Sequence, residues 1–278
     1  MLRPGIARSA PLLRVGSKNF TEQLVVGELF AQALEAAGAR VERRLNLGGT
    51  AIAQRALTSG EIDLYPEYTG TGLGVVLRQP PEGDAASILA RVRAGYEAEF
   101  DCTWLDPSGI DNGNALLVLP ATARRHGLTT LSDLARVAPQ LTLAAGNDSP
   151  TAPMGCLGCD GSMAWIPPLS PIAALGLRYA ALAHGQADVV NAYATDWQIA
   201  VGGYTVLRDD RGLWPPYQLA AVVRRAALRD VPGLADPLLA IGARLDNPVM
   251  QELNRQVDQD GDEPREVAAR FRSAQGLG

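Results

Sequence analysis

The stretch SGEIDLYPEYTGT, residues 59–71, predicts the end of a helix, a short strand and a turn that carries a tyrosine. A second stretch, HGQADVVNAYATD at residues 184–196, repeats this pattern much later in the chain. The residues that match at the same offsets are Gly60, Asp63 and Tyr68 in the first stretch and Gly185, Asp188 and Tyr193 in the second. The repeat predicts two similar lobes, each of which presents a tyrosine at the end of a strand. We expect the two aspartates to be structural, because an aspartate at the start of a strand usually fixes a local turn.

The composition is that of a folded chain with room for two domains. The 278 residues are 47% hydrophobic and 20% charged, which is enough apolar surface to form real cores. The formal net charge of −5 argues against a nucleic-acid-binding protein, which would carry a basic stripe. No apolar run approaches the length that spans a membrane, and the first dozen residues lack the apolar segment of a signal peptide. The chain is therefore either cytosolic or exported by a signal outside this sequence, and the composition leaves both open.

Cysteine and histidine are sparse. The cysteines are Cys102 and the pair Cys156 and Cys159, whose spacing fits a local disulfide, a redox pair or half a metal site. Without a second such pair zinc is disfavoured, and we prefer a structural pair that is buried or disulfide-bonded. His126 and His184 each precede a glycine at an expected helix end and belong to no nucleophile or metal motif. We expect no enzyme activity, no metal and no cofactor.

The order of elements predicts an α/β fold with a mainly parallel sheet. Residues 12–16 predict a strand and 21–37 a helix, and strands and helices then alternate up to the opening stretch. Ligands of such sheets bind beyond the carboxyl ends of the strands. Lys18, the only lysine, lies at that end, where the N-terminus of a helix favours an anion. Asn19 and Glu22 have the spacing of a capping box for this helix.

Two chain crossings divide the expected elements into two lobes. We take the strand at 115–119 as the first crossing and the strand at 218–223 as the return. Lobe one comprises residues 12–114 and 218–278, and lobe two comprises residues 115–217. Two α/β lobes joined by two hinge strands, with a ligand cleft between them, form the architecture of a hinge-bending binding protein.

Five motifs in register resemble the substrate-binding proteins of the osmoprotectant ABC importers, the glycine betaine, choline and carnitine group. The motifs are VGSKNFTEQ at 15–23, LGGT at 47–50, residues 63–71, AYATD at 192–196 and PPY at 215–217. They cover nearly the whole chain from residue 12 onward. The resemblance implies a periplasmic-binding-protein fold and a ligand held in a box of aromatic rings. A quaternary ammonium has no hydrogen to donate, so a protein holds it against electron-rich ring faces.

The motif matches imply ligand-binding roles for named residues. The aromatic box falls on Tyr68, Tyr193 and Tyr217, and polar or anion-recognising roles fall on Lys18, Gln23 and Thr71. Two further polar residues, Asn112 and Asn114, lie at the expected crossing, where they either face the cleft or cap a turn.

The chain departs from the family pattern at two places. Asn114 stands where family members often carry an aromatic residue, and residues 151–153 lack the arginine that often binds a ligand carboxylate. The box is one ring short unless Trp165 or Trp197 completes it. The expected ligand is a quaternary-ammonium osmolyte of the glycine betaine or choline type. The alternatives are another small polar or cationic solute, such as ergothioneine or an amino acid, and a sensor or an enzyme on the same fold.

The resemblance also implies a partner and a cellular location for the protein. The expected partner is the transmembrane permease of an ABC importer, to which the closed protein hands its solute. The expected location is extracytoplasmic, either periplasmic or anchored at the cell surface. We expect a monomer that binds no nucleic acid.

Overall fold

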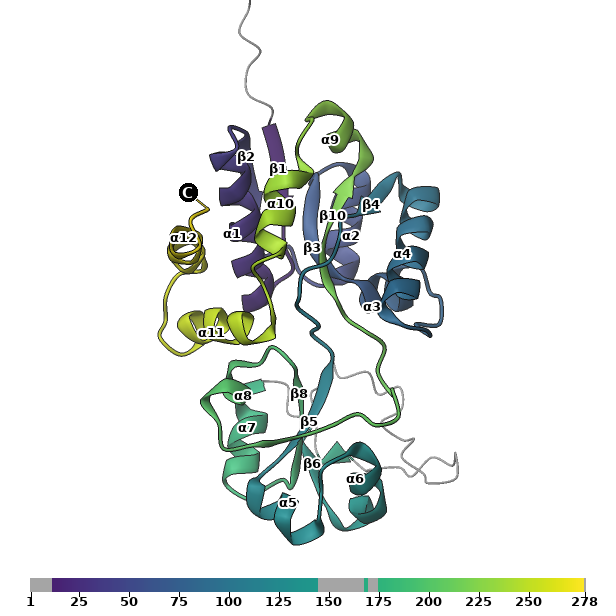
Figure 1. The fold of residues 1–278 in the computed structure, drawn as a ribbon, viewed down its shortest axis with the longest axis vertical. Helices are drawn as coiled ribbons and strands as arrows, with labels where there is room; N and C mark the ends of the chain where they lie inside the picture. The colour runs from purple at the N-terminus through teal and green to yellow at the C-terminus, as the bar shows by residue number, and fades with distance from the viewer. Residues whose placement is uncertain (1–11, 145–167, 170–174, 278) are drawn as a thin grey trace, which may run out of the picture. The chain divides into compact units, whose positions relative to one another are not determined.

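The fold, obtained as a computed structural model, is described for residues 12–144, 168–169 and 175–277. These residues form two mixed α/β sheets with helices packed on them (Figure 1). None of the helices described is both long and apolar enough to cross a membrane.

The chain divides into two compact units. The first comprises Met1–Asp111 together with Pro216–Gly278, and the second comprises Asn112–Pro215. Asn114 therefore belongs to the second unit and Tyr217 to the first, each across the lobe limit drawn from the sequence. The lobe limits drawn from the sequence, after residues 114 and 217, stay a prediction.

The first unit contains a five-stranded sheet in the order β2-β1-β3-β10-β4. Its strands are β1 Leu12–Gly16, β2 Arg40–Arg44, β3 Leu64–Tyr68, β4 Cys102–Trp104 and β10 Leu219–Arg224. β1 runs parallel to β2 and β3, whereas β10 runs antiparallel to β3 and β4. The sheet is therefore mixed and not mainly parallel as predicted, because β10, from the segment that follows the second unit in sequence, runs antiparallel to both of its neighbours.

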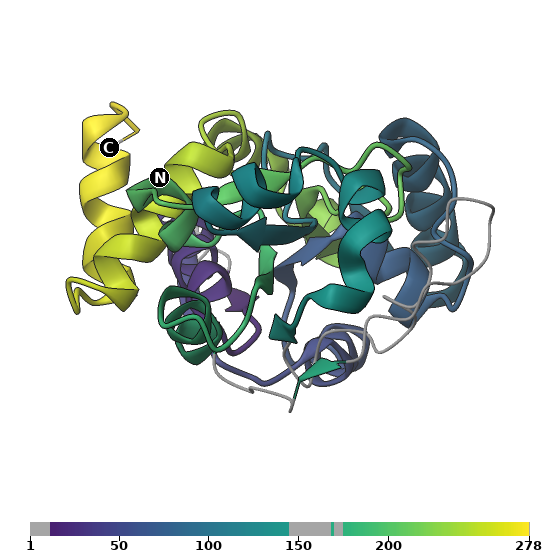
Figure 2. The same cartoon turned by 90° about the horizontal axis from the view of Figure 1, so that it is seen from below.

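Helices connect the strands of this sheet and extend beyond its last strand. They are α1 Thr21–Ala36, α2 Thr50–Ser59, α3 Thr69–Thr71, α4 Ala85–Phe100, α9 Arg225–Asp230, α10 Ala235–Gly242, α11 Asn247–Asp258 and α12 Pro264–Ala274. α2 ends at Gly60, whose φ of 80° lies in the left-handed region that glycine adopts without strain. α3 continues into a π-helical turn, Gly72–Val76. The last two helices, α11 and α12, lie side by side (Figure 2).

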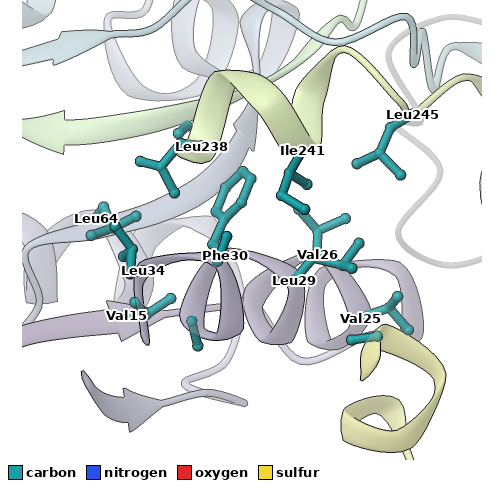
Figure 3. Close-up of a cluster of buried hydrophobic side chains, with 14 of the residues drawn as sticks. Val15, Val25, Val26, Leu29, Phe30, Leu34, Leu64, Leu238, Ile241 and Leu245 are labelled. Atoms are coloured by element: carbon teal, nitrogen blue, oxygen red, sulfur yellow. The ribbon is translucent and has the colours of Figure 1, made fainter. Parts of the chain in front are cut away.

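Two cores cover the two faces of the first sheet. Val223 of β10 joins the core that α1, α10, α11 and α12 cover, and its neighbour Val222 joins the core formed with α2 and α4. In the first core, Phe30 of α1 points toward Leu238 and Ile241 of α10 (Figure 3). Each such apolar side chain contributes about 1.5–3 kcal/mol when it is buried. The cores therefore hold α1 and the sheet firmly at the place where the candidate site residues emerge.

The second unit repeats the strand pattern of the first. Its sheet has the order β7-β6-β8-β5-β9. The strands are β5 Asn114–Val118, β6 Leu143–Ala144, β7 Pro168–Leu169, β8 Val189–Tyr193 and β9 Thr205–Leu207. β6 runs parallel to β7 and β8, and β5 runs antiparallel to β8 and β9. β5, the strand expected as the first crossing, thus pairs along its length within this sheet.

Four helices of the second unit are described. They are α5 Pro120–His126, α6 Leu131–Val137, α7 Leu175–Ala183 and α8 Trp197–Val201. α6 starts with a capping box, in which the side chains of Thr130 and Asp133 bind each other's backbone N–H groups. α5 and α6 pack on one core of the sheet and α7 on another, so this sheet too is covered on both faces.

The two aspartates of the repeat hold equivalent pairs of strands. Asp63 accepts a hydrogen bond from the backbone N of Arg14 at 2.8 Å, and its own backbone N donates to the Arg14 carbonyl at 2.7 Å. Asp188 forms the same two bonds with Thr142, at 2.9 and 2.8 Å. Each aspartate thus joins the strand that ends in the tyrosine to its parallel neighbour, and the repeated aspartates are structural.

Candidate functional site

Most of the candidate residues in the first unit emerge at one edge of the sheet. Lys18 follows β1, Gln23 lies in the first turn of α1, Tyr68 ends β3, and Thr71 ends α3. β1 and β3 are parallel neighbours, so their carboxyl ends meet at the same edge. The topology therefore brings these side chains into one region, which is where the sequence predicts a ligand.

Lys18 forms a buried ion pair in this region. Its Nζ lies 2.5 Å from Oε1 of Glu67, and the two residues are only 4% and 0% exposed. The same Oε1 accepts a hydrogen bond from the backbone N of Tyr68 at 2.8 Å. The Lys18 ammonium also lies 4.6 Å from the centroid of the Tyr68 ring and 5.5 Å from that of Phe20. Lys18 is thus part of the cluster, but its charge already has a carboxylate partner.

Tyr68 is held by a carboxylate and by a second ring. Its hydroxyl donates to Oε1 of Glu22 at 2.6 Å, and both residues are buried. The Phe20 ring stacks on the Tyr68 ring with a centroid distance of 6.4 Å and an interplanar angle of 13°. A hydrogen bond to a charged acceptor is short and strong, and it leaves more negative charge on the phenol. The ring is therefore fixed in place and well suited to a cation at its face.

The predicted capping box at the start of α1 is wrong. The helix is preceded by Phe20, with no side-chain cap. Glu22 reaches Tyr68 of β3 instead of the helix backbone. Sequence spacing could not reveal this contact, because the two partners lie 46 positions apart in the chain.

Tyr217 packs against the turn that follows Tyr68. A Cβ placed on Gly70 would come within 2.9 Å of the Tyr217 ring and 2.8 Å of the Pro216 carbonyl oxygen. The backbone N of Tyr217 donates to Asp111 at 2.8 Å. Burial, and then the charge of Asp111, raise the pKa of Tyr217, so its hydroxyl stays protonated. The structure thus places Tyr217 beside the turn that follows Tyr68.

The close approach at Gly70 makes a testable prediction. Gly70→Ala is expected to push the Tyr217 ring away from the turn, because a Cβ at 2.8–2.9 Å from backbone and ring atoms cannot fit without movement. We expect solute affinity to fall about threefold to tenfold and the free energy of unfolding to fall by about 1–3 kcal/mol. Calorimetric titration and thermal unfolding measure the two effects.

Gly74→Ala is the matched control, because a Cβ there would meet nothing closer than 3.8 Å. It should leave affinity and stability nearly unchanged. Equal affinity in the two variants and the wild type would show that the position of the Tyr217 ring does not matter for binding.

The two polar candidates of the first unit differ in accessibility. Gln23 is fully buried, and neither atom of its amide forms a hydrogen bond within the described part of the chain. Thr71 is partly exposed. A buried amide is usually satisfied, so Gln23 stays a prediction for a polar ligand contact.

The candidates of the second unit gather at one end of its sheet. Asn114 begins β5 and lies opposite Tyr193, which ends β8. Oδ1 of Asn114 is 3.4 Å from Nδ2 of Asn191, and Oδ1 of Asn112 accepts a hydrogen bond from the backbone N of Thr195 at 3.3 Å. Asn112 thus caps a turn, and Asn114 joins a polar contact within the sheet.

Several residues near the site were missed by sequence reasoning. Glu22, Glu67 and Phe20 contact the predicted residues directly, and Gly70 provides the space for Tyr217. All four residues lie inside the two motifs that contain Lys18 and Tyr68, at 15–23 and 63–71, and this position could have marked them as candidates.

Several other residues discussed from the sequence lie outside the described residues. Cys156, Cys159, Trp165 and residues 151–153 are outside the described residues. Trp197 begins α8. Cys102 is a buried free thiol, whose pKa is raised to about 11 by burial. Among the described side chains, none form a cluster that could hold a metal ion.

Comparison with known proteins decides the family. Residues 11–274 match the family described as the substrate-binding domain of ABC-type glycine betaine transport systems. The chain belongs to this family. It is 31% identical to the carnitine transport binding protein OpuCC of Listeria monocytogenes, over 96% of this chain and 88% of that protein. It is 34% identical to a glycine-betaine-binding protein of Pseudomonas aeruginosa, again over 96% of this chain and 88% of that protein.

A solved structure shows the same fold. A crystal structure described as a glycine betaine/carnitine/choline ABC transporter has a TM-score of 0.82 and 27% sequence identity, over 95% of this chain and 99% of that one. The family match confirms the resemblance carried by the five motifs, and the structural match confirms the periplasmic-binding-protein fold. This family member is therefore a substrate-binding protein of the ABC-importer class.

Proposed function

We propose that this protein captures a small quaternary-ammonium solute of the glycine betaine or choline type and delivers it to the permease of an ABC importer. The observation that carries the proposal is the Tyr68 cluster. A ring fixed by Glu22 and stacked on Phe20 already has the Lys18 ammonium near its face. Ring faces beside carboxylates provide the chemistry that a methylated ammonium needs.

The proposal assigns the predicted contacts to the solute. Tyr68, Tyr193 and Tyr217 supply ring faces, each worth about 0.5–2 kcal/mol to a cation. Lys18, Gln23, Thr71, Asn112 and Asn114 supply polar contacts. Several rings are required, because one contact of that size gives little affinity. The solute leaves the protein chemically unchanged.

A ligand screen by thermal shift tests the proposal. Glycine betaine, choline and carnitine are expected to raise the melting temperature, while glycine and ethanolamine, which lack the methyl groups, are expected to leave it unchanged. At a hundredfold excess over Kd a ligand adds about 2.7 kcal/mol of stability, which corresponds to a rise of several degrees for a chain of this size. A response only to solutes without a quaternary ammonium contradicts the proposed ligand.

The same proposal implies where the protein acts and what it contacts. A solute-binding protein of an importer acts outside the cytoplasm, in the periplasm or anchored at the cell surface, and meets the transmembrane permease there. We propose that it works as a monomer. Size-exclusion chromatography with light scattering, with and without glycine betaine, checks this state.

A further inference from the structure

An asparagine at the start of α11 binds the backbone of the segment that leads out of the first unit. Nδ2 of Asn247 donates to the carbonyl of Asp111 at 3.0 Å, and Oδ1 of Asn247 accepts a hydrogen bond from the backbone N of the same residue at 2.9 Å. Asp111 is the last residue of the first unit before the chain enters the second, and Asn247 comes from the C-terminal part of the first unit. One amide thus binds both polar backbone groups of Asp111, which requires a side chain with a donor and an acceptor side by side.

The Asn247 side chain continues a parallel backbone ladder. Gly109 and Asp246 form a parallel bridge, in which the backbone N of Gly109 donates to the carbonyl of Leu245 at 2.9 Å. One step further along such a ladder, the N–H of Asp111 would bind the backbone carbonyl of residue 247. Because α11 begins at Asn247, the backbone there turns into the helix, and the side-chain Oδ1 takes the place of the backbone carbonyl. A Cβ on Gly109 would come within 2.9 Å of the Leu245 carbonyl oxygen, so the glycine lets the two segments approach.

Asp111 in turn fixes the backbone of Tyr217. Oδ1 of Asp111 accepts a hydrogen bond from the backbone N of Tyr217 at 2.8 Å. Two prolines precede Tyr217 in the motif PPY, so this N–H is the first backbone donor after them. The ring of Tyr217 lies against Gly70, in the turn that follows β3. The contacts therefore run from Asn247 through Asp111 to Tyr217, and all three residues belong to the first unit.

We propose that Asn247 is a positioning residue of the solute site, and that it acts through Asp111 on the ring of Tyr217. This inference rests on the proposed function, in which Tyr217 supplies a ring face. Placement of the ring matters there because the attraction of a cation depends on its closeness to the ring face. The amide of Asn247 is uncharged, so it holds Asp111 without neutralising the carboxylate that binds the backbone N of Tyr217.

Two substitutions of Asn247 test the inference. Asn247→Ala removes both hydrogen bonds to Asp111, whereas Asn247→Asp retains the shape and an acceptor but loses the donor to the Asp111 carbonyl. In both variants the affinity for glycine betaine, measured by calorimetric titration, is expected to fall about fivefold to tenfold. Amide hydrogen exchange of Tyr217 in the ligand-free protein, followed by NMR, should become about fivefold faster or more, because its acceptor is no longer held in place.

A double-mutant cycle separates positioning of the ring from a general effect on the fold. In a Tyr217→Leu background, Asn247→Ala should cost no further affinity, because the ring through which Asn247 acts has been removed. If the loss of affinity in the double variant equals the sum of the two single losses, Asn247 does not act through Tyr217 and the inference is overturned.

Asp246→Ala is the matched control at the neighbouring position. Oδ1 of Asp246 caps α11 by accepting a hydrogen bond from the backbone N of Val249 at 2.9 Å, and the substitution leaves the Asn247 amide intact. It should lower the melting temperature by about 2–4 °C and leave both the affinity and the exchange of the Tyr217 amide unchanged. An equal loss of affinity in Asp246→Ala and Asn247→Ala overturns the inference.

The exchange measurement also decides the inference if the proposed function fails. If the wild type binds none of glycine betaine, choline and carnitine, the proposed ligand is wrong, whatever Asn247 does. Faster exchange of the Tyr217 amide confined to Asn247→Ala and Asn247→Asp then supports the positioning of Tyr217. Unchanged exchange in Asn247→Ala, or equally fast exchange in Asp246→Ala, overturns it.

Discussion

Replacing Glu67 by glutamine is expected to lower the free energy of unfolding by about 3–5 kcal/mol. The carboxylate of Glu67 is fully buried, and it binds both the ammonium of Lys18 and the backbone N of Tyr68. Glutamine retains the shape but leaves the buried Lys18 charge without its counter-charge. The loss is larger than for a typical hydrogen bond because an unpaired charge in the interior is far from water. Urea denaturation followed by circular dichroism measures it.

Two further variants isolate the cause of this loss. Glu42→Gln removes the surface partner of Arg14 and Arg44, and all three side chains are more than a third exposed. It should cost less than about 1 kcal/mol. The double variant Lys18→Met with Glu67→Leu removes both buried charges and is expected to recover most of the stability lost in Glu67→Gln. If Glu67→Gln costs no more than Glu42→Gln, the Lys18–Glu67 pair is not the anchor that we infer.

The internal repeat explains why the fold was predictable from the sequence. Asp63 and Asp188 make the same pair of backbone bonds to a neighbouring parallel strand, so a local pattern carried information about tertiary structure. The glycines that precede them, such as Gly60, end a helix in a conformation that favours glycine. The orientation of β5 and β10 relative to their neighbouring strands was harder to predict. Their unbroken apolar runs, residues 115–118 and 219–223, fit either orientation, and only the pairing shows that both run antiparallel to their neighbours.

The candidate site was less predictable because its decisive contacts join residues far apart in the chain. Lys18 and Glu67 lie 49 positions apart, and Asn114 and Asn191 lie 77 apart. Lys18 drew attention as the only lysine, yet its nearest charge is a carboxylate of the protein. Asn247 gave no signal at all, since an asparagine at the start of a helix is normally a cap. Only the structure shows its two hydrogen bonds to Asp111.

Replacing Tyr68 by leucine is expected to lower the affinity for glycine betaine about thirtyfold, the equivalent of about 2 kcal/mol. Leucine fills much of the space but offers no electron-rich face. It also removes the hydroxyl that donates to Glu22 and the ring that stacks on Phe20. Calorimetric titration measures the affinity, and thermal unfolding shows how much of the change comes from the fold.

Two other tyrosine variants separate the ring from the hydroxyl and binding from stability. Tyr68→Phe retains the ring but takes the hydroxyl donor from buried Glu22, so it should cost about 1–3 kcal/mol of stability and reduce affinity less than leucine does. Tyr96→Leu alters a fully buried tyrosine in the core formed with α4 and should lower stability with little effect on affinity. Wild-type affinity in Tyr68→Leu would rule out a cation–π contact at this ring. If Tyr96→Leu lowers the affinity as much as Tyr68→Leu does, the loss of affinity reflects the loss of stability, and the Tyr68 ring has no specific role in binding.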